Sequence, residues 1–381
     1  MSNTLTTIAP ILYSAAKEVA NEPTGMLQAI NMNFDNKGVA KGDTVRVPVA
    51  PTRAATDFTP AAVSTAGADA ISSAVAVSIA ESKKVSWHLD GEQIRSLENG
   101  TNYEDWVGQM TKQGMRTLRN LAEAAAWNEG RKSSTRAIGA PATDPFASTV
   151  GNLTAARQIL LDNGAPMADL QCVIDSAAGT SLRNLGLVQN AYQAGNNKQL
   201  ISGTFQPMFG FGIRESAAIV STTAGTASGS TVNATGYAVG TTTLTLSSAG
   251  AGTLLAGDYV TFAGDTNIYC LTSGSGDVSA GGTITLASPG LKVAMSAATK
   301  AITVKAASKQ NLAFERSALV GVCRPPLVPV NATIEQMEIT DASGLTYLML
   351  DIQQYGMRTM ELHLAYGFKA VNPEFISTIL A

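Results

Sequence analysis

A stretch of 84 residues near the middle of the chain carries almost no charge. Between Ser216 and Thr299 the only charged residues are Asp258, Asp265, Asp277 and Lys292. Alternating, strand-like runs recur through this stretch and are separated by Ser, Gly and Ala turns: TLTL, YVTFA, IYCLT, TITLA and AITVK. The pattern predicts a small antiparallel barrel or sandwich inserted within another domain, preceded by a flexible boundary at residues 221–236.

Two alternating runs upstream predict an extended β hairpin. Valines alternate with other residues at 45–49, and a second alternating run follows at 75–79 after a segment rich in Ala, Thr, Ser and Pro. Pro48 confines the first strand to an edge, because proline has no N–H to donate to a neighbouring strand. Such an arm buries little of its own surface, so we expect it to lie on a neighbouring copy of the chain.

The N-terminal residues predict a short amphipathic helix. Pro10 suits a first helical turn, and the residues 21–23 end the helix. Its apolar positions are Ile11, Leu12, Ala15, Ala16 and Val19. This segment has too little apolar area for a core of its own, so it is either an arm that packs on something else or a frayed terminus. It has neither a basic start nor a long apolar run, so we expect no signal peptide, and no stretch of the chain is long and apolar enough to predict a membrane span.

The clearest helix is predicted at 101–129. Thr101-Asn102-Tyr103-Glu104 fits a capping box, apolar residues then recur at helical spacing, and Gly130 is expected to end the helix. The polar side carries three basic residues, Lys112, Arg116 and Arg119. They could face DNA, but a solvated or salt-bridged face is the favoured interpretation.

Helices and strands alternate after this helix, which indicates an α+β sheet domain. The predicted elements are a helix at 152–162 with Asn152 as N-cap, a buried strand at 170–174, a helix at 176–192 and a strand around 211–214. Residues 345–380 predict a final β hairpin. One face of its second strand carries Met360, Leu362, Leu364 and Tyr366, and the other face carries Glu361, His363 and Ala365.

The composition is poor in charge. Charged residues make up 14% of the chain, against about 25% in ordinary soluble domains. This favours a surface covered by other copies of the chain, since interface cores are depleted in charge, although a secreted or low-complexity β protein has a similar composition. The net charge is −3 and no long run of Lys or Arg exists, so any contact with nucleic acid should be weak and non-specific.

No residue pattern predicts catalysis, a cofactor or a metal site. His88 and His363 each stand alone in a predicted strand. Asp258 and Asp265 flank one turn, where they could bind a divalent cation weakly, but turn formation is the favoured role. The cysteines are odd in number and far apart, which predicts small buried residues in a reducing compartment: Cys172, Cys270 and Cys323. We therefore expect a protein that is not an enzyme.

The order of these parts resembles the major capsid (coat) protein of tailed bacteriophages, which has the HK97-like fold. The resemblance rests on element order and on four short patterns: KGDTVRVPV at 41–49, TNYEDWVGQMTKQGMRTLRNLAEAAA at 101–126, LLAGDYVTFAG at 254–264 and YGFKAVNPEF at 366–375. The inserted barrel is similar, more narrowly, to the coat proteins of the P22-like group. The fold class that this implies is α+β, with N-arm, extended β-hairpin loop, spine helix, axial domain and an inserted small β-barrel domain.

The resemblance also implies a division of the chain. The segments are an N-terminal arm (1–35), an extended loop that reaches across a neighbour (36–85), a peripheral domain with the spine helix (86–135), an axial domain (136–215), the inserted barrel (216–307), the axial return (308–345) and the final hairpin of the peripheral domain (346–381). The axial domain would surround the five- and six-fold axes of a shell.

The implied function is self-assembly, as pentamers and hexamers, into an icosahedral shell that encloses double-stranded DNA. Implied partners are the chain itself, a scaffolding protein, a portal and non-specifically packaged DNA, with no membrane. Assembly would take place in the cytoplasm of a host bacterium, and the product would be a virion capsid. The alternatives are an encapsulin-like compartment shell and, less favoured, a protein whose β domain binds carbohydrate.

Four basic residues of the predicted loop region are candidate inter-subunit contacts: Arg46, Arg53, Lys83 and Lys84. Solvated surface charges are the alternative explanation for all four.

Overall fold

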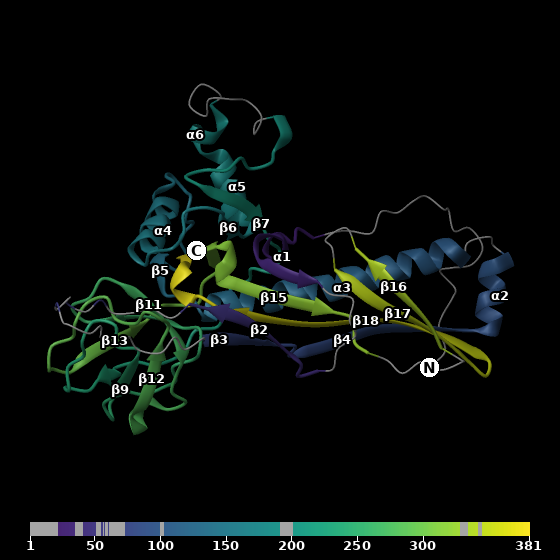
Figure 1. Cartoon of the computed structure of the whole chain (residues 1–381). Helices are drawn as coiled ribbons and strands as arrows, with labels where there is room; N and C mark the ends of the chain where they lie inside the picture. Colours follow the sequence, from purple (N-terminus) through teal and green to yellow (C-terminus); the bar gives the residue numbers. More distant parts are fainter. Residues whose placement is uncertain are drawn as a thin grey trace.

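The computed structural model describes residues 22–34, 41–50, 73–99, 103–190, 201–327, 334–341 and 345–381, and the single residues 55, 57 and 60. A long helix and a sheet form an extended arm, a barrel lies at one end of it, and a helical and sheet unit rises next to the barrel (Figure 1). The predicted helix at 10–20, the predicted N-cap Thr101 and the candidate Arg53 lie outside the described residues. Within the described ranges, no helix has both the length and the apolar character that crossing a membrane requires.

The long helix α3 (Tyr103–Lys132) packs on a six-stranded sheet. The strands are β1 (Asn31–Phe34), β4 (Glu81–Asp90), β15 (Leu319–Arg324), β16 (Ile334–Thr340), β17 (Thr346–Gln354) and β18 (Met357–Ala370). Two shorter helices flank α3, namely α1 (Gly25–Ala29) and α2 (Gly91–Asn99). β18 pairs along one edge with β17 and then β15, and along the other edge with β4. The largest core fills the space between α3 and this sheet.

The predicted faces of the last long strand are confirmed. Met360, Leu362, Leu364 and Tyr366 are all buried in the core beneath α3. Ala365 lies on the other face, as predicted, and it is buried there too, because Val77, Ile79 and Val322 pack over it. This part of the sheet is therefore covered on both sides.

A second sheet continues from the base of α3. Its strands in this part are β5 (Arg136–Gly139), β6 (Leu170–Ile174), β7 (Phe211–Glu215), β14 (Gln310–Glu315) and β19 (Ile376–Leu380). The associated helices are α4 (Gly151–Asp162), α5 (Ser176–Asn184), α6 (Gly186–Gln189), η2 (Arg316–Ala318) and η3 (Pro373–Phe375). Because β19 pairs with β5 and β14, the last strand of the chain belongs to this sheet and not to that of the final hairpin.

The low-charge stretch forms a closed barrel. Its six strands are β8 (Thr231–Val232), β9 (Thr243–Leu246), β10 (Tyr259–Phe262), β11 (Ile268–Ser273), β12 (Gly282–Leu286) and β13 (Lys300–Val304), with η1 (Val278–Ala280) between β11 and β12. The strands pair in the order β10-β13-β8-β9-β12-β11, and β11 pairs again with β10, which closes the ring. The predicted antiparallel barrel is confirmed.

The expected flexible boundary at 221–236 is wrong. The amide of Thr222 donates to the Ser308 carbonyl over 3.1 Å, and the amide of Ala227 donates to the Thr253 carbonyl over 3.0 Å. Residues 231–232 form β8 itself. Small polar residues predict flexibility only when their backbone groups lack partners, and here the two ends of the insertion pair with each other and with the barrel.

Three helix boundaries also differ from expectation. Gly130 does not end α3; it is buried where a side chain would meet Leu312, so the glycine allows close packing within the helix. The N-cap of α4 is Val150 and not Asn152, whose side-chain amide donates to the carbonyl of Pro145. The predicted helix at 176–192 is interrupted at Leu185, which has extended backbone between α5 and α6.

The hairpin of β2 (Thr44–Val49) and β3 (Ser73–Ser78) is rooted on the sheet through Gly367 of β18. A Cβ atom at this glycine would lie 2.0 Å from the carbonyl oxygen of Ser78, which is a backbone atom that cannot turn away. Glycine at this position therefore lets the base of the hairpin sit directly against β18.

We predict that Gly367→Ala lowers the free energy of unfolding by about 1–3 kcal/mol, because the added methyl group forces the two backbones apart. The matched control is Gly108→Ala on α3, where a Cβ meets nothing within 4 Å. Alanine there should stabilise the helix by roughly 0.5–1 kcal/mol. Urea unfolding of both variants checks this, and equal effects of the two substitutions would contradict the close contact at Gly367.

Candidate assembly surfaces

The β2–β3 hairpin has one apolar face and one polar face. Val45 lies opposite Val77, and Val47 lies opposite Val75, as an antiparallel hairpin requires. The valine face packs on the cluster that contains Val77, but Val45, Val47 and Val75 remain only half-buried. Arg46 lies on the opposite, exposed face. The predicted hairpin is confirmed, and the described part of the chain covers its apolar face only in part.

Lys83 and Lys84 are not on this hairpin. They lie on β4, which is a full member of the six-stranded sheet through its pairing with β18. Lys83 forms an ion pair of 2.8 Å with Glu81, and Lys84 forms one of 2.8 Å with Glu361 on β18. The ion pair with Lys83 lowers the pKa of Glu81. The expected loop boundary at 85 thus includes sheet residues, since alternation alone cannot tell a paired strand from a free arm.

A short N-terminal strap, residues 22–34, ties the middle of α3 to both sheets. Buried Glu123 on α3 accepts hydrogen bonds from the amides of Met26 and Leu27, at 2.7 and 2.8 Å, and from the Ser216 hydroxyl at 2.6 Å. β1 continues the strap as a parallel partner of β15. Burial raises the pKa of Glu123, and the three hydrogen bonds only partly offset this. One carboxylate therefore joins the strap, α3 and the start of the insertion.

The strap has a second attachment at Glu22. Its carboxylate accepts hydrogen bonds from the guanidinium of Arg116 and, over 2.8 Å, from the side chain of Asn120. These bonds lower the pKa of Glu22 from 4.5 to about 2. Arg116, one of the three basic residues on the predicted polar side of α3, thus forms a salt bridge, in agreement with the favoured interpretation. Arg119 is instead buried, with its nearest acidic partner Asp341 at 3.5 Å.

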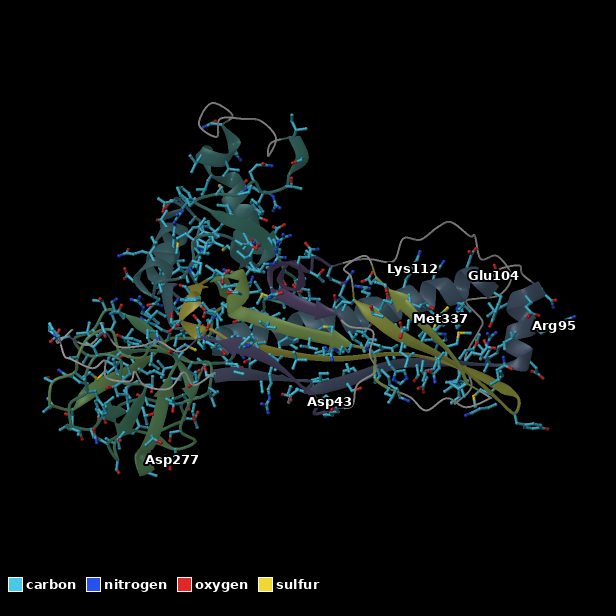
Figure 2. The ribbon with its side chains drawn as sticks, viewed as in Figure 1. Asp43, Arg95, Glu104, Lys112, Asp277 and Met337 are labelled. Carbon is cyan, nitrogen blue, oxygen red and sulfur yellow. The ribbon has the colours of Figure 1, made fainter. Side chains whose placement is uncertain are left out.

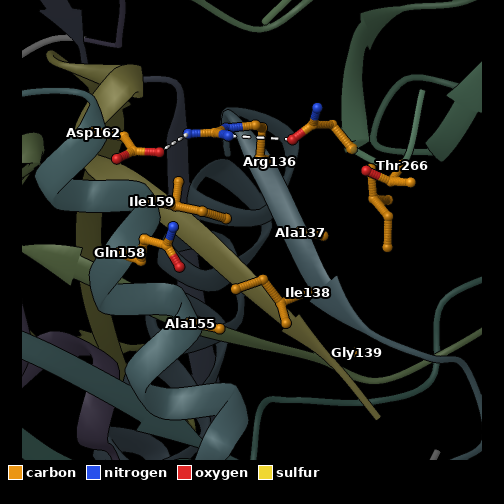
Figure 3. A pocket seen from close by; sticks show the side chains of 11 residues that line it. Arg136, Ala137, Ile138, Gly139, Ala155, Gln158, Ile159, Asp162 and Thr266 are labelled. Carbon is orange, nitrogen blue, oxygen red and sulfur yellow. Dashed lines mark hydrogen bonds and ion pairs between the residues drawn. The ribbon is translucent and has the colours of Figure 1, made fainter.

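The barrel is joined to the second sheet by strand pairing. β11 pairs with β5, with Ile268 opposite Ala137 and Tyr269 opposite Arg136, so a single run of eleven strands passes from the barrel to β7. Beside this junction, a crevice of about 330 Å³ lies between β5, α4 and the turn before β11. Arg136 spans it, donating to Asn267 over 3.3 Å and lying 3.8 Å from Asp162 on α4 (Figure 3). The crevice is bridged by these contacts, which tie the barrel turn to α4.

The barrel also binds the C-terminal end of α3. The hydroxyl of buried Tyr259 lies 2.9 Å from the Arg131 carbonyl and 2.8 Å from the Thr378 hydroxyl. The thiol of Cys270 lies 3.4 Å from the same Arg131 carbonyl. The last carbonyls of a helix have no partner within the helix, so side chains of the barrel here act as its cap. Burial raises the pKa of Tyr259 well above its ordinary value and that of Cys270 to about 12, which keeps both groups protonated as donors.

The predicted turn aspartates and buried cysteines are confirmed. Asp258 accepts hydrogen bonds from the amides of Leu255 and Gly225, and Asp265 accepts them from the amide of Asn267 and from the hydroxyl of Tyr269.

All three cysteines are buried and free. His363 lies 2.9 Å from Glu361, and His88 is exposed on β4. Among the residues that the structure describes, no group of three His, Cys, Asp or Glu side chains could hold a metal ion.

Known structures match the fold over its whole length. A structure of Mycobacterium phage Che8 aligns with a TM-score of 0.50 and 15% identity, covering 99% of this chain and 98% of that one. The capsid structure of cyanophage P-SCSP1u aligns with a TM-score of 0.52 and 12% identity, covering 100% of this chain and 95% of that one. The chain has a phage capsid fold. No protein-family model matches the sequence, and no curated protein sequence matches it.

The structure also contains contacts that the sequence did not predict. Glu123 interrupts an otherwise apolar segment of the predicted helix, in NLAEAAAW, and this was the available signal for a buried carboxylate. The contact of Tyr259 with the end of α3 joins residues 128 positions apart, and no local pattern indicates it.

We predict that Tyr259→Phe lowers the free energy of unfolding of this capsid fold by about 1–2 kcal/mol, because the Thr378 hydroxyl and the Arg131 carbonyl lose a buried partner. Tyr355→Phe is the control, since the Tyr355 side chain is fully exposed on the β17–β18 turn. Thermal and urea unfolding measure the difference. A Tyr259→Phe protein as stable as the control would show that the barrel does not cap α3.

The Glu22 contact should make stability depend on pH in a defined window. A carboxyl group whose pKa falls on folding contributes stability above its ordinary pKa, and the contribution disappears as the pH drops towards the folded value. Glu22→Gln should therefore cost about 1 kcal/mol at pH 7, and the difference from the unchanged protein should shrink between pH 4.5 and about 2. Glu92→Gln on the exposed face of α2 is the control, and unfolding curves across this pH range provide the measurement.

Proposed function

We propose that this chain is the major capsid protein of a tailed bacteriophage and that its function is to assemble an icosahedral shell around double-stranded DNA. The supporting observation is the alignment with the capsid structure of cyanophage P-SCSP1u, and with a structure of Mycobacterium phage Che8, over nearly the whole length of each chain. The half-buried valine face of the β2–β3 hairpin adds a physical reason for self-association, because apolar surface left beside a sheet is stabilised by burial against another copy.

The proposed roles follow the division expected from the sequence. The loop before β4 reaches onto a neighbouring subunit, and α3 is the spine of the peripheral domain, to which β15 and β16 also belong because they pair in its sheet. The segments 136–215 and 308–318, which belong to the second sheet, surround the five- and six-fold axes. One chain then forms both pentamers and hexamers, so each contact is modest and many copies sum to a stable shell. In this proposal the shell forms in the bacterial cytoplasm with a scaffolding protein and a portal, and it becomes the capsid of the virion.

We further assign the chain to capsid proteins of the P22-like group, which carry an inserted barrel. The closed barrel supports this assignment. The barrel at 216–307 is attached to the rest of the chain in three places: β11 pairs with β5, Tyr259 and Cys270 cap α3, and Arg136 ties the barrel turn to α4. A barrel held at three points keeps a fixed direction in each subunit, so it can stabilise the subunit and help to set the size of the shell.

The charge of the chain suits a container that releases its contents. A net charge of −3 gives no general attraction to the phosphate backbone. We propose that packaged DNA is confined by the shell and contacted only non-specifically.

The three candidate contact residues that the structure describes separate into two kinds. Arg46 is exposed and forms no ion pair with any residue in the described ranges, so it is available to a neighbouring copy. Lys83 and Lys84 already hold partners within the chain, and their use between subunits would be an addition to those pairs. Arg53 lies outside the described residues, so its proposed role as an inter-subunit contact rests on the sequence alone.

Assembly of the purified chain tests the proposal. Expressed alone or together with a scaffolding protein, the chain should give closed particles in negative-stain electron microscopy and sediment as large assemblies. A stable monomer or small oligomer under both conditions would overturn the shell function and favour a ligand-binding β domain. Particles that co-purify with a protein cargo and no nucleic acid would favour the encapsulin-like alternative.

Charge reversals at two candidate positions add a sharper prediction. Arg46→Glu should leave the unfolding midpoint unchanged and lower the yield of particles several-fold, because it changes only a surface offered to the neighbour. Lys84→Glu should instead lower the free energy of unfolding by up to about 1 kcal/mol, because it places two acids side by side on β4 and β18. Unfolding curves and sedimentation of the same preparations distinguish the two effects; unchanged particle yield for Arg46→Glu would remove this residue from the interface.

A further inference from the structure

A buried polar cluster lies where α3 meets the β16–β17 pair. This Arg119 cluster consists of Arg119 of α3, Asp341 directly after β16, and Tyr347 of β17. Arg119 is 6% exposed and Tyr347 is 0% exposed. The Nη1 atom of Arg119 donates to Asp341 over 3.5 Å, which is the outer limit of a hydrogen bond. The Nε and Nη2 atoms of Arg119 and the Tyr347 hydroxyl have no hydrogen-bond partner among the described residues.

These unpaired groups destabilise the single subunit. A buried donor without an acceptor loses its hydration and gains nothing in exchange, and an incompletely paired buried charge is less favourable than a well-packed apolar residue. Two other buried polar side chains that join α3 to distant segments are paired: Glu123 accepts three hydrogen bonds, and the Tyr259 hydroxyl has two partners within 2.9 Å. The Arg119 cluster therefore needs an explanation that these contacts do not.

A small movement is enough to complete the cluster. A hydrogen bond between a guanidinium and a carboxylate is about 2.7–2.9 Å long, so the contact of Arg119 with Asp341 is less than about 1 Å too long. Thr340 pairs with Thr346 at this end of β16 and β17, so Asp341 and Tyr347 follow directly after one pair of the same ladder. An approach of this end of the strand pair to α3 therefore brings both residues towards Arg119 together.

β16 is the strand that can make this movement. It is the outermost of the described strands of its sheet, where it pairs with β17 on one side only. Its side chains are largely exposed: Met337, at 56%, lies beside α3 (Figure 2), and Glu335 and Glu338 are exposed on either side of it. An open edge strand with an exposed large apolar side chain is a surface on which another chain can bind.

We propose that the Arg119 cluster is incomplete in the single subunit and is completed in the shell, when a second copy binds the edge of β16 and moves it towards α3. In the completed state Arg119 binds Asp341 through two N–H groups and the Tyr347 hydroxyl through the third. The cluster then lowers the stability of the free subunit and raises that of the shell, so it favours assembled over free chains. This inference rests on the proposed shell function, but the free subunit can be measured without a shell.

Substitutions that remove the unpaired groups test the free subunit. Tyr347→Phe removes an unpaired hydroxyl and should raise the midpoint temperature of unfolding by about 2 °C, whereas Tyr259→Phe removes a paired hydroxyl and should lower it. Arg119→Met should also raise the midpoint, whereas Arg116→Met, which takes a partner from Glu22, should lower it. If Tyr347→Phe lowers the midpoint as Tyr259→Phe does, the cluster is already satisfied in the single subunit, as by an ordered water, and the proposal is overturned.

Assembled particles test the completed state. When particles are heated and their break-up is followed by light scattering and electron microscopy, those of Arg119→Met and Tyr347→Phe should break up at a lower temperature than those of the unchanged chain. This is opposite in sign to the effect on the free subunit, and a change of the same sign in both would overturn the proposal. If the unchanged chain forms no particles, the shell function fails and the completed state fails with it, while the subunit measurements still decide whether the cluster is unpaired.

Discussion

The position of α3 on its sheet is the constraint on which the rest of the molecule depends, and distant segments hold it unevenly along its length. At its C-terminal end, Tyr259 and Cys270 of the barrel bind the carbonyls that the helix leaves open. In its middle, Glu123 binds the strap and Ser216. Beside its N-terminal half, the structure describes an open groove. The first residue of the helix is held as well, because the guanidinium of Arg358 on β18 donates to the hydroxyl of Tyr103 over 2.7 Å.

The barrel is attached both to the end of α3 and to the second sheet. Its strands close on themselves, which leaves no free edge within the ring, yet β11 also pairs with β5 and so extends the ring into the second sheet. The insertion is consequently part of the hydrogen-bonded framework and not a module on a tether. In a shell, such a subunit would move the barrel, the second sheet and the end of α3 together. Differences in subunit angle would then arise in the outer half of the arm and in the hairpin.

The β2–β3 hairpin is fully packed at its base and only half-buried along its length. Its base is pressed against β18 at Gly367, and Val77 and Ile79 are fully buried there. Further out, one face keeps half-buried valines and the other carries the exposed Arg46. A structure that is tightly packed at its root and partly uncovered along its length has the form expected of an arm that finishes its burial on another copy.

The sequence by itself determined the local elements. Alternation of valines predicted the hairpin, the apolar repeat predicted α3, and the loss of charge after Ser216 predicted the barrel, because these patterns record which side of an element is buried. Only the tertiary structure decided that residues 221–236 are ordered, that Lys84 pairs with Glu361, that Arg119 is buried and that Glu123 holds the strap. Each of these depends on a partner far away in the chain, and a periodic pattern shows that a face is covered without showing which segment covers it.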